Sequence, residues 1–255
     1  MKGTRFLEGR TALVTGASRG IGAATAQALA RAGCAEVLLH YGAWRGGAEA
    51  VARAAEAAGA SAPIWQADLS TPAGIASLAE RVRAHGRVDV LVNNAGSLLR
   101  RVRLAESSAE FFDETFNLNV KSLWLVTQAA AAGMVERGAG VVVNVSSIAA
   151  RTGGGPGATL YAAAKAAVSG ITKGLAKELA PAGVRVNAVS PGTVDNDFHA
   201  RFSTREALES VVKATPQGRL STNEDIAAVI LFLCSPEAGN VHGQTIEVNG
   251  GAFMI

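Results

Sequence analysis

A tyrosine and a lysine stand four residues apart in the second half of the chain. Tyr161 and Lys165 lie in an Ala-rich stretch of helical periodicity, so both side chains share one face of a helix, one turn apart. A phenol with a pKa of about 10 is almost wholly protonated at pH 7. An ammonium about 4 Å away stabilises the phenolate by up to ~4 kcal/mol at an effective dielectric constant of about 20. The pair is therefore a candidate for general acid–base chemistry, although a helix with a surface lysine has the same spacing.

A glycine-rich turn near the N-terminus has the form of a phosphate site. The sequence Gly16-Ala17-Ser18-Arg19-Gly20-Ile21-Gly22 joins a predicted strand to a predicted helix. Glycines let backbone amides approach a pyrophosphate, and a helix N-terminus adds partial positive charge. The turn therefore predicts a dinucleotide site with six contact residues, which are Gly16, Ser18, Arg19, Gly20, Ile21 and Gly22.

The end of the second predicted strand distinguishes NAD from NADP. An acidic residue there would accept hydrogen bonds from the ribose 2′-hydroxyl of NAD, but positions 37–43 contain no Asp or Glu. Arg19 and Arg45 offer the cationic surroundings that a 2′-phosphate prefers, and Tyr41 is a further cofactor contact at the strand end. NADP(H) is favoured, while use of both cofactors, with NAD(H) accepted, stays open.

Short β-type runs alternate with longer helical stretches through most of the chain. This alternation is typical of βαβ units around a parallel sheet whose strands are buried on both faces. Seven strands are predicted, over Thr11–Thr15, Glu36–His40, Ala62–Ala67, Val88–Asn93, Val141–Ser146, Val184–Ser190 and Thr245–Val248. Six helices are predicted, over Gly20–Ala32, Gly46–Ala58, Pro72–His85, Asn119–Arg137, Thr159–Leu179 and Asn223–Leu233, the last with a capped start at Asn223-Glu224-Asp225;.

This order of elements predicts the fold class. We expect an α/β protein with a single-domain, Rossmann-type, doubly wound sheet of seven parallel strands and helices on both faces, because no linker or repeat divides residues 1–255;. Two segments, 97–106 and 195–220, interrupt the alternation after strand ends, where such folds bind ligands. The segment 195–220 is interpreted as a polar helical lid over a substrate, with Phe198 and Phe202 offering apolar contact and His199, Arg201 and Arg205 offering charge.

Composition excludes several other classes of protein. Hydrophobic residues make up 49% of the chain, charged residues 18%, and the formal net charge is +3, which excludes disordered and coiled-coil chains. The densest basic cluster, Arg100, Arg101 and Arg103, has no interleaved aromatic residues, so no nucleic-acid partner is expected. That cluster would suit an anionic substrate only if it faces the pocket.

Cysteine usage and hydropathy give further expectations. Cys34 and Cys234 stand alone, so no metal site is expected and each is interpreted as a small buried hydrophobic residue. The longest apolar run has eight residues, 227–234, far short of a membrane span. We expect no membrane partner and a cytoplasmic location.

Six motifs in order make the chain resemble the short-chain dehydrogenase/reductase family over essentially its whole length. They are the glycine turn at 15–22, Asn93-Asn94-Ala95-Gly96, Asn119, Ser146-Ser147, Tyr161 with Lys165, and Pro191-Gly192. The resemblance implies hydride transfer between a nicotinamide and a small-molecule ketone or secondary alcohol, with no metal.

The resemblance also implies a role for each catalytic residue. Tyr161 is expected to be the general acid in ketone reduction and the base in alcohol oxidation, and Ser147 to hold the substrate oxygen. Lys165 is expected to lower the phenol pKa and to bind the nicotinamide ribose, and Asn119 to hold a water that continues the proton path. Ser146 and Asn117 are the neighbouring alternatives to Ser147 and Asn119.

Further cofactor contacts are implied in the same way. The adenine is expected against Asp68 and Leu69, the adenosine ribose against Asn94, Ala95 and Gly96, and the nicotinamide against Pro191, Gly192 and Val194. Asn196 and Asn249 stand where the family usually has Thr and Asp.

The implied activity is that of an NADP(H)-dependent oxidoreductase, either a 3-oxoacyl thioester reductase or a sugar, polyol or small hydroxy-ketone dehydrogenase. Relatives that dock an acyl carrier protein use basic residues at two places where this chain has Glu136-Arg137-Gly138 and Pro181-Ala182-Gly183, which disfavours a carrier-bound substrate. A non-catalytic NADP-sensing protein is the alternative from a different class. The resemblance also implies a homotetramer, joined through the helices at 119–137 and 159–179 and through the C-terminal strand.

Overall fold

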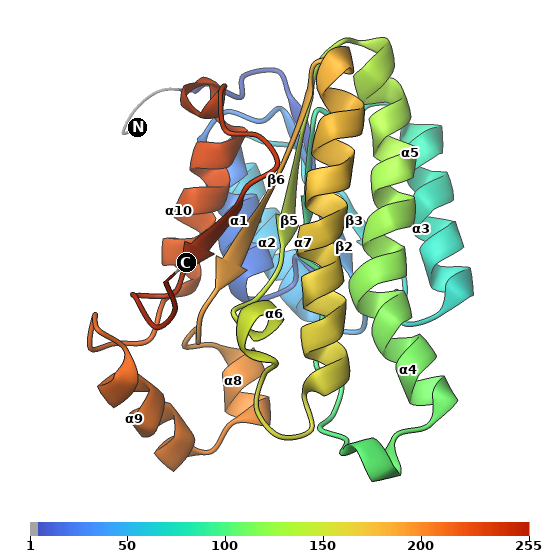
Figure 1. Cartoon of the computed structure of the whole chain (residues 1–255). Coiled ribbons are helices and arrows are strands. Elements are labelled where there is room, and N and C mark those ends of the chain that lie inside the picture. Colours follow the sequence, from blue (N-terminus) through green and yellow to red (C-terminus); the bar gives the residue numbers. More distant parts are fainter. Residues whose placement is uncertain (1–4, 255) are drawn as a thin grey trace.

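The computed structural model describes residues 5–254, without the side chain of Ala200. Seven strands form one all-parallel sheet in the order β3-β2-β1-β4-β5-β6-β7 (Figure 1). The predicted Rossmann-type doubly wound sheet is thereby confirmed, and residues 1–4 and 255 of the predicted domain lie outside the described residues. The strands are β1 (Thr11–Val14), β2 (Glu36–Tyr41), β3 (Ile64–Gln66), β4 (Val90–Asn93), β5 (Gly140–Val145), β6 (Val184–Pro191) and β7 (Thr245–Val248).

Helices cover both faces of the sheet (Figure 1). One face carries α1 (Gly20–Arg31), α2 (Arg45–Ala57) and α10 (Asn223–Cys234), and the other carries α3 (Pro72–His85), α5 (Ser122–Glu136) and α7 (Thr159–Leu179). Shorter helices are α4 (Ala109–Phe116), α6 (Ala149–Thr152), α8 (Asp197–Phe202) and α9 (Arg205–Ala214), with 3₁₀ turns at Leu104–Glu106, Ala180–Ala182 and Pro236–Ala238. No helix within residues 5–254 has the length and apolar character that crossing a membrane requires.

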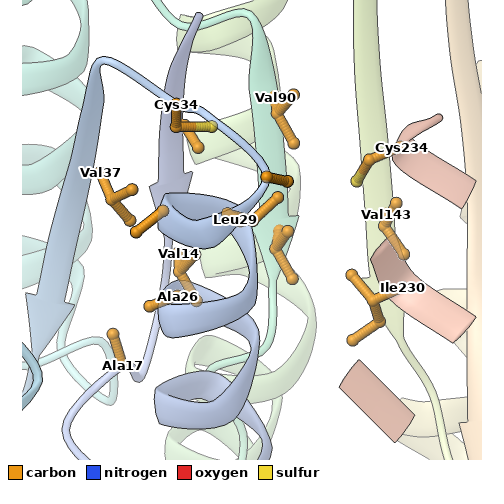
Figure 2. Packing of buried hydrophobic residues seen from close by; sticks show 14 of the residues in the cluster. Val14, Ala17, Ala26, Leu29, Cys34, Val37, Val90, Val143, Ile230 and Cys234 are labelled. Carbon is orange, nitrogen blue, oxygen red and sulfur yellow. The ribbon is translucent and has the colours of Figure 1, made fainter. Parts of the chain in front are cut away.

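Each face of the sheet has its own hydrophobic core. Figure 2 shows part of the core beneath α1, α2 and α10, where Val14, Leu29 and Ile230 are fully buried. Cys34 and Cys234 belong to this core as free thiols, which confirms that they are buried hydrophobic residues. Burial raises the pKa of both thiols to about 12.

The helical region around Asn119 differs from the prediction. Asn119 does not begin a helix: α4 runs through a π-helical turn, Asn117–Lys121, directly into α5. The earlier start at Ala109 has a local cause, because the Ser108 side chain accepts a hydrogen bond from the Phe111 amide and caps α4;. The π turn then shifts the helical phase by one residue.

The lid segment and the start of α10 are fixed by side-chain caps. Asn196 caps α8 and Thr204 caps α9, so the predicted polar lid consists of two short helices. Thr222, one residue before the predicted start, caps α10 in a capping box with Asp225;. Helices α6, α8 and α9 all lie at the end of the sheet toward which the strands point (Figure 1).

Candidate active site

A cavity of about 610 Å³ opens at the carboxyl ends of the central strands. Its wall combines the glycine turn after β1, the segments that follow β4, β5 and β6, the start of α7, and α8. The strand order reverses between β1 and β4, which is where doubly wound sheets bind ligands. This volume suits half of a dinucleotide, or a small substrate beside a dinucleotide.

The glycine turn lines one part of this cavity, called the cofactor half because the dinucleotide is expected there, with Gly16, Ser18, Arg19, Gly20 and Ile21 in its wall. No side chain caps the N-terminus of α1, and its first turn contains no acidic residue, so its amides are available to an anion. Gly22 lies behind the wall, where a Cβ would collide with the Gly16 carbonyl oxygen and the Asn94 amide. These residues fit a pyrophosphate.

One buried and one half-buried side chain, His40 and Asn94, fix the shape of the turn. The His40 Nδ1 accepts a hydrogen bond from the Gly16 amide at 3.1 Å, and its Nε2 lies 3.0 Å from the Ala67 carbonyl, to which it donates. Burial lowers the pKa of His40 to about 4, so the ring is neutral at pH 7. The Asn94 amide donates to the carbonyls of Thr15 and Gly16 at 2.9 and 3.1 Å, and so ties the end of β4 to the turn.

Two arginines lie near the region beyond β2, and each is paired with a carboxylate. The Arg19 guanidinium lies 5.1 Å from the ring centroid of Trp44 and 3.5 Å from the Asp197 carboxylate. Arg45 instead pairs with Glu49 on its own helix at 2.8 Å. Sequence reasoning missed Trp44, which is 47% exposed. An aromatic residue directly before a predicted helix was the signal that could have identified it.

Besides Gly22, three predicted cofactor residues lie outside the cavity wall. Tyr41 is 6% exposed at the end of β2, and Leu69 is packed in the hydrophobic core under α3. Asp68 is exposed, and its carboxylate accepts hydrogen bonds from the Ser70 amide and hydroxyl. The remaining predicted contacts, Asn94, Ala95, Gly96, Pro191, Gly192 and Val194, line the cavity.

Tyr161, Lys165 and Ser147 meet on the opposite wall. The Lys165 Nζ lies 5.7 Å from the Tyr161 ring centroid and donates a hydrogen bond to the Val145 carbonyl at 2.8 Å. Both residues are on α7, one turn apart, whereas Ser147 follows β5. The structure therefore brings together residues that the sequence separates by up to eighteen positions.

Burial controls the ionisation of this pair. It raises the pKa of Tyr161 to about 12, with a hydrogen bond involving Ser147 acting in the opposite direction, and it lowers the pKa of Lys165 to about 8. Burial is the largest cause of the Tyr161 shift, and the Lys165 ammonium donates to the Val145 carbonyl; that Lys165 lowers the phenol pKa stays a prediction.

The two adjacent serines have different surroundings. The Ser146 hydroxyl is buried, lies 2.9 Å from the Lys165 carbonyl, to which it donates, and 3.2 Å from the Ser169 hydroxyl. The Ser147 hydroxyl accepts from the Ala149 amide at 3.1 Å and is the one that interacts with Tyr161. Only Ser147 can present its hydroxyl beside the phenol.

Asn119 is buried and forms hydrogen bonds with the loop that follows β4. Its Nδ2 donates to the carbonyls of Ser97 and Thr115 at 3.0 and 2.9 Å, and its Oδ1 accepts from the Ser97 amide at 3.1 Å. A Cβ on Gly96 would lie 2.8 Å from both the Asn119 Oδ1 and the Lys165 Nζ. Glycine is thus required for Asn119 and Lys165 to approach one another across this loop. Asn117 begins the π turn, and neither Asn117 nor Asn119 belongs to the cavity wall.

The substrate half of the cavity lies under the lid. Phe198, His199, Arg201 and Phe202 of α8 all line it, as does Arg101 from the loop after β4. Arg205 does not: its side chain is 88% exposed and pairs with Glu209. Asn196 lines the cavity while capping α8 and bonding to Asn223 at 3.0 Å. The loop after α6 also contributes to the wall, and the Gly153-Gly154-Gly155-Pro156-Gly157 run is the overlooked sequence signal for it.

The chain matches a protein-family model described as enoyl-(acyl carrier protein) reductase over residues 16–252. It is 41% identical to an uncharacterized oxidoreductase of Methylorubrum extorquens, covering 96% of this chain and 98% of that protein. It is 36% identical to the 3-oxoacyl-[acyl-carrier-protein] reductase of Escherichia coli, with 97% and 99% covered.

A solved structure is similar at the level of the whole fold. A putative NAD(P)-dependent gluconate 5-dehydrogenase from Beutenbergia cavernae, with bound NADP, superposes with a TM-score of 0.90 at 39% identity, covering 98% of this chain and 99% of that one. Since the family model and these relatives span nearly all of the sequence, the chain belongs to the short-chain dehydrogenase/reductase family and is an NAD(P)-dependent oxidoreductase.

Proposed function

We propose that this enzyme uses NADP(H) to interconvert a ketone and a secondary alcohol with Ser147, Tyr161 and Lys165 as its catalytic residues. The observation that carries the proposal is the meeting of the Tyr161 phenol, the Ser147 hydroxyl and the buried Lys165 on one wall of the cavity. The glycine turn on the opposite wall would hold the pyrophosphate. When bound, the nicotinamide supplies or accepts the hydride.

In ketone reduction, the Ser147 hydroxyl would donate a hydrogen bond to the substrate oxygen. Tyr161 would transfer its proton to that oxygen as negative charge develops there. The raised pKa of Tyr161, about 12, keeps the phenol protonated at pH 7 and so suits the acid role. Lys165, one helical turn away, would stabilise the phenolate that remains.

A path for reprotonation would lead from Tyr161 past Lys165 toward Asn119. The approach of Lys165 Nζ and Asn119 Oδ1 to the same point beside Gly96 supports this direction. The Asn119 side-chain amide is hydrogen-bonded to backbone groups of Ser97 and Thr115. Asn119 would therefore serve mainly to position the loop after β4, and the proposed relay water would lie beside it.

A preference for NADP(H) is supported by the charges beyond β2. Arg19 stacks on Trp44 at the rim of the cofactor half, and a guanidinium there can form charge-assisted hydrogen bonds with a 2′-phosphate. The Beutenbergia cavernae protein is described with bound NADP.

Two substrate classes follow from the relatives. The Escherichia coli relative is a 3-oxoacyl-[acyl-carrier-protein] reductase, and the Beutenbergia cavernae protein is described as a putative gluconate dehydrogenase. A sugar-type or hydroxy-ketone substrate is favoured by the polar residues of the lid, which include His199 and Arg201.

We also propose that the working form is a homotetramer in the cytoplasm. Exposed apolar residues on α4 and α5, among them Phe112, Trp124 and Val135, support an interface through these helices.

The test of the catalytic assignment is Tyr161→Phe, followed by NADPH absorbance with a panel of keto sugars, cyclic ketones and β-ketoacyl thioesters. The variant should lose at least ~10²-fold in kcat while binding NADPH as the unaltered enzyme does. Normal turnover in the variant would overturn the assignment. Binding of NADPH by the unaltered protein without turnover of any ketone would support the NADP-sensing alternative instead.

A further inference from the structure

Two arginines in the wall of the substrate half have no acidic partner. Arg101 and Arg201 both line the cavity, and in the described part of the chain neither forms an ion pair with a carboxylate. Their neighbours differ: Arg100 pairs with Glu114 at 3.4 Å and Arg205 with Glu209 at 3.0 Å. Of these four arginines, the two without a carboxylate partner are the two that face the cavity.

Arg101 is held in place by backbone groups. Its Nε donates to the Phe202 carbonyl at 3.1 Å, and its Nη1 donates to the Pro156 carbonyl at 2.9 Å. These bonds join the loop after β4 to the lid helix α8 and to the loop before α7. Both acceptors are neutral carbonyls, so the side chain is oriented while its positive charge is left uncompensated.

Arg201 lies on the lid next to the same residue. Its guanidinium is 5.1 Å from the Phe202 ring centroid, while the Phe202 carbonyl accepts from Arg101. Both cations therefore contact Phe202, Arg101 through its carbonyl and Arg201 through its ring.

The other titratable groups of this wall do not cancel that charge. Asp197 pairs with Arg19 at 3.5 Å, on the side of the cofactor half. The His199 Nδ1 lies 3.2 Å from the Ser203 hydroxyl, and burial, helped by Arg101, lowers the pKa of His199 to about 4. His199 is neutral at pH 7, and the substrate half is positive.

An aromatic chain separates the cations from the phenol. The Tyr161 and Phe198 ring centroids are 5.9 Å apart, and those of Phe198 and Phe202 are 5.0 Å apart. Two ring contacts thus lie between Tyr161 and Phe202, the residue that both arginines contact. An anionic group bound by the arginines would sit several bonds from a carbonyl bound by Ser147 and Tyr161.

We propose that the substrate is a keto acid, or the corresponding hydroxy acid, whose carboxylate lies several bonds from the reacting carbon and is bound by Arg101 and Arg201. This inference rests on the proposed function, since it takes the reacting oxygen to lie beside Ser147 and Tyr161. Arginine suits the task because its planar donors match a carboxylate. A simple 3-oxoacyl chain has no such charge to place there.

The experiment compares acids with neutral ketones of matched shape. The two pairs are 5-oxohexanoate with its methyl ester, and 5-keto-D-gluconate with L-sorbose, which has a hydroxymethyl group in place of the carboxylate. Steady-state reduction by NADPH is measured for the unaltered enzyme and for Arg101→Met, Arg201→Met and Arg100→Met. Arg100 is the matched control because it is adjacent to Arg101 but pairs with Glu114 outside the cavity wall.

The unaltered enzyme should prefer the acid in at least one pair by about tenfold or more in kcat/KM, as expected for a charge-assisted hydrogen bond. Arg101→Met and Arg201→Met should each remove most of that preference by raising KM for the acid far more than KM for the neutral ketone, and Arg100→Met should retain it.

Each other outcome has a defined meaning. Equal rates on acid and neutral ketone would overturn the carboxylate site while leaving the ketone reductase intact. A variant that slows both substrates alike would also overturn it, because the arginine would then act by holding the lid and not by binding a carboxylate. Failure of the unaltered enzyme to reduce any ketone would instead count against the proposed function.

Discussion

Tyr161 and Lys165 each have a charged form that burial disfavours. The pKa of Tyr161 is raised to about 12 and that of Lys165 is lowered to about 8, so near pH 7 the phenol holds its proton while the amine is largely charged. Ketone reduction needs that combination, because the phenol gives up a proton and the ammonium faces the phenolate left behind. At the scale of single residues, burial keeps the proton on the Tyr161 phenol at pH 7.

The adjacent serines give a matched test of which hydroxyl acts on the substrate. Ser147→Ala should lower kcat by at least ~10²-fold, because the hydroxyl beside the phenol is lost. Ser146→Ala removes a buried hydrogen bond to the Lys165 carbonyl and should mainly cost about 1 kcal/mol of unfolding free energy. Steady-state rates and urea unfolding of both variants measure this. The reverse pattern would assign the substrate oxygen to Ser146.

Arg19 provides a test of cofactor preference. Arg19→Ala should lower kcat/KM for NADPH by about tenfold or more relative to NADH, because a charge-assisted contact with the 2′-phosphate is lost. Trp44→Leu should act in the same direction with a smaller effect, since the ring supports the guanidinium. Arg31→Ala, at the other end of α1, serves as the control. An unchanged NADPH/NADH ratio in Arg19→Ala would contradict a role for Arg19 at the 2′-phosphate.

At the scale of elements, His40 connects β2 to the turn after β1 and to the segment after β3. The neutral ring accepts from Gly16 and donates to Ala67, and protonation would remove the acceptor at Nδ1. The shape of the glycine turn therefore depends on the ionisation state of His40, a residue outside the cavity wall.

His40 should make stability depend on pH between about 4 and 6.5. Its pKa is lowered from 6.5 to about 4 in the folded chain, so in this range the unfolded chain binds the proton and the folded chain does not. Stability must then fall as the pH decreases, by up to about 3 kcal/mol from this one group. Urea unfolding from pH 7 to 4.5 should show a smaller fall in His40→Asn.

His199 has a lowered pKa as well, so the difference between the unaltered protein and His40→Asn isolates the share of His40. Parallel stability curves for the two proteins would contradict this account. Weaker NADPH binding in His40→Asn at pH 7 would additionally link the ring to the glycine turn.

The elements show how far sequence reasoning reached. Strand β1 was predictable within one residue because a buried parallel strand is a continuous apolar run, here Ala12, Leu13 and Val14;. Helix α4 was missed, since it joins α5 through a π turn that leaves no break in hydrophobic pattern. The direction of the Tyr161 pKa shift was also beyond the sequence, because it depends on how deeply the folded chain buries the phenol.

At the scale of the whole molecule, two helices present surfaces suited to association. The exposed stripe of α5 consists of Trp124, Gln128, Ala132 and Val135, and that of α7 consists of Ala163, Ala166, Gly170 and Gly174. Figure 1 shows α5 and α7 next to one another, on the face of the sheet that also carries α3. A Cβ on Gly170 or Gly174 would meet only open space, so another helix could approach closely there.

The proposed tetramer should lose subunits when charge is placed on these stripes. Trp124→Glu puts a carboxylate where apolar surface would be buried, and an unpaired charge is costly to desolvate. Gly170→Glu does the same on α7 while raising helix propensity, since Gly costs about 1 kcal/mol relative to good helix formers. A loss of subunits in Gly170→Glu therefore cannot be attributed to a weakened helix.

Leu104→Glu is the control, because Leu104 is 95% exposed on a 3₁₀ turn outside both stripes. Light-scattering mass should equal four chains for the unaltered protein and Leu104→Glu, and two or one for the stripe variants. A monomeric unaltered protein would refute the tetramer itself. A tetramer that survives both stripe variants would move the interface to another surface, where β7 is the next candidate because it pairs only with β6 and leaves its outer edge open;.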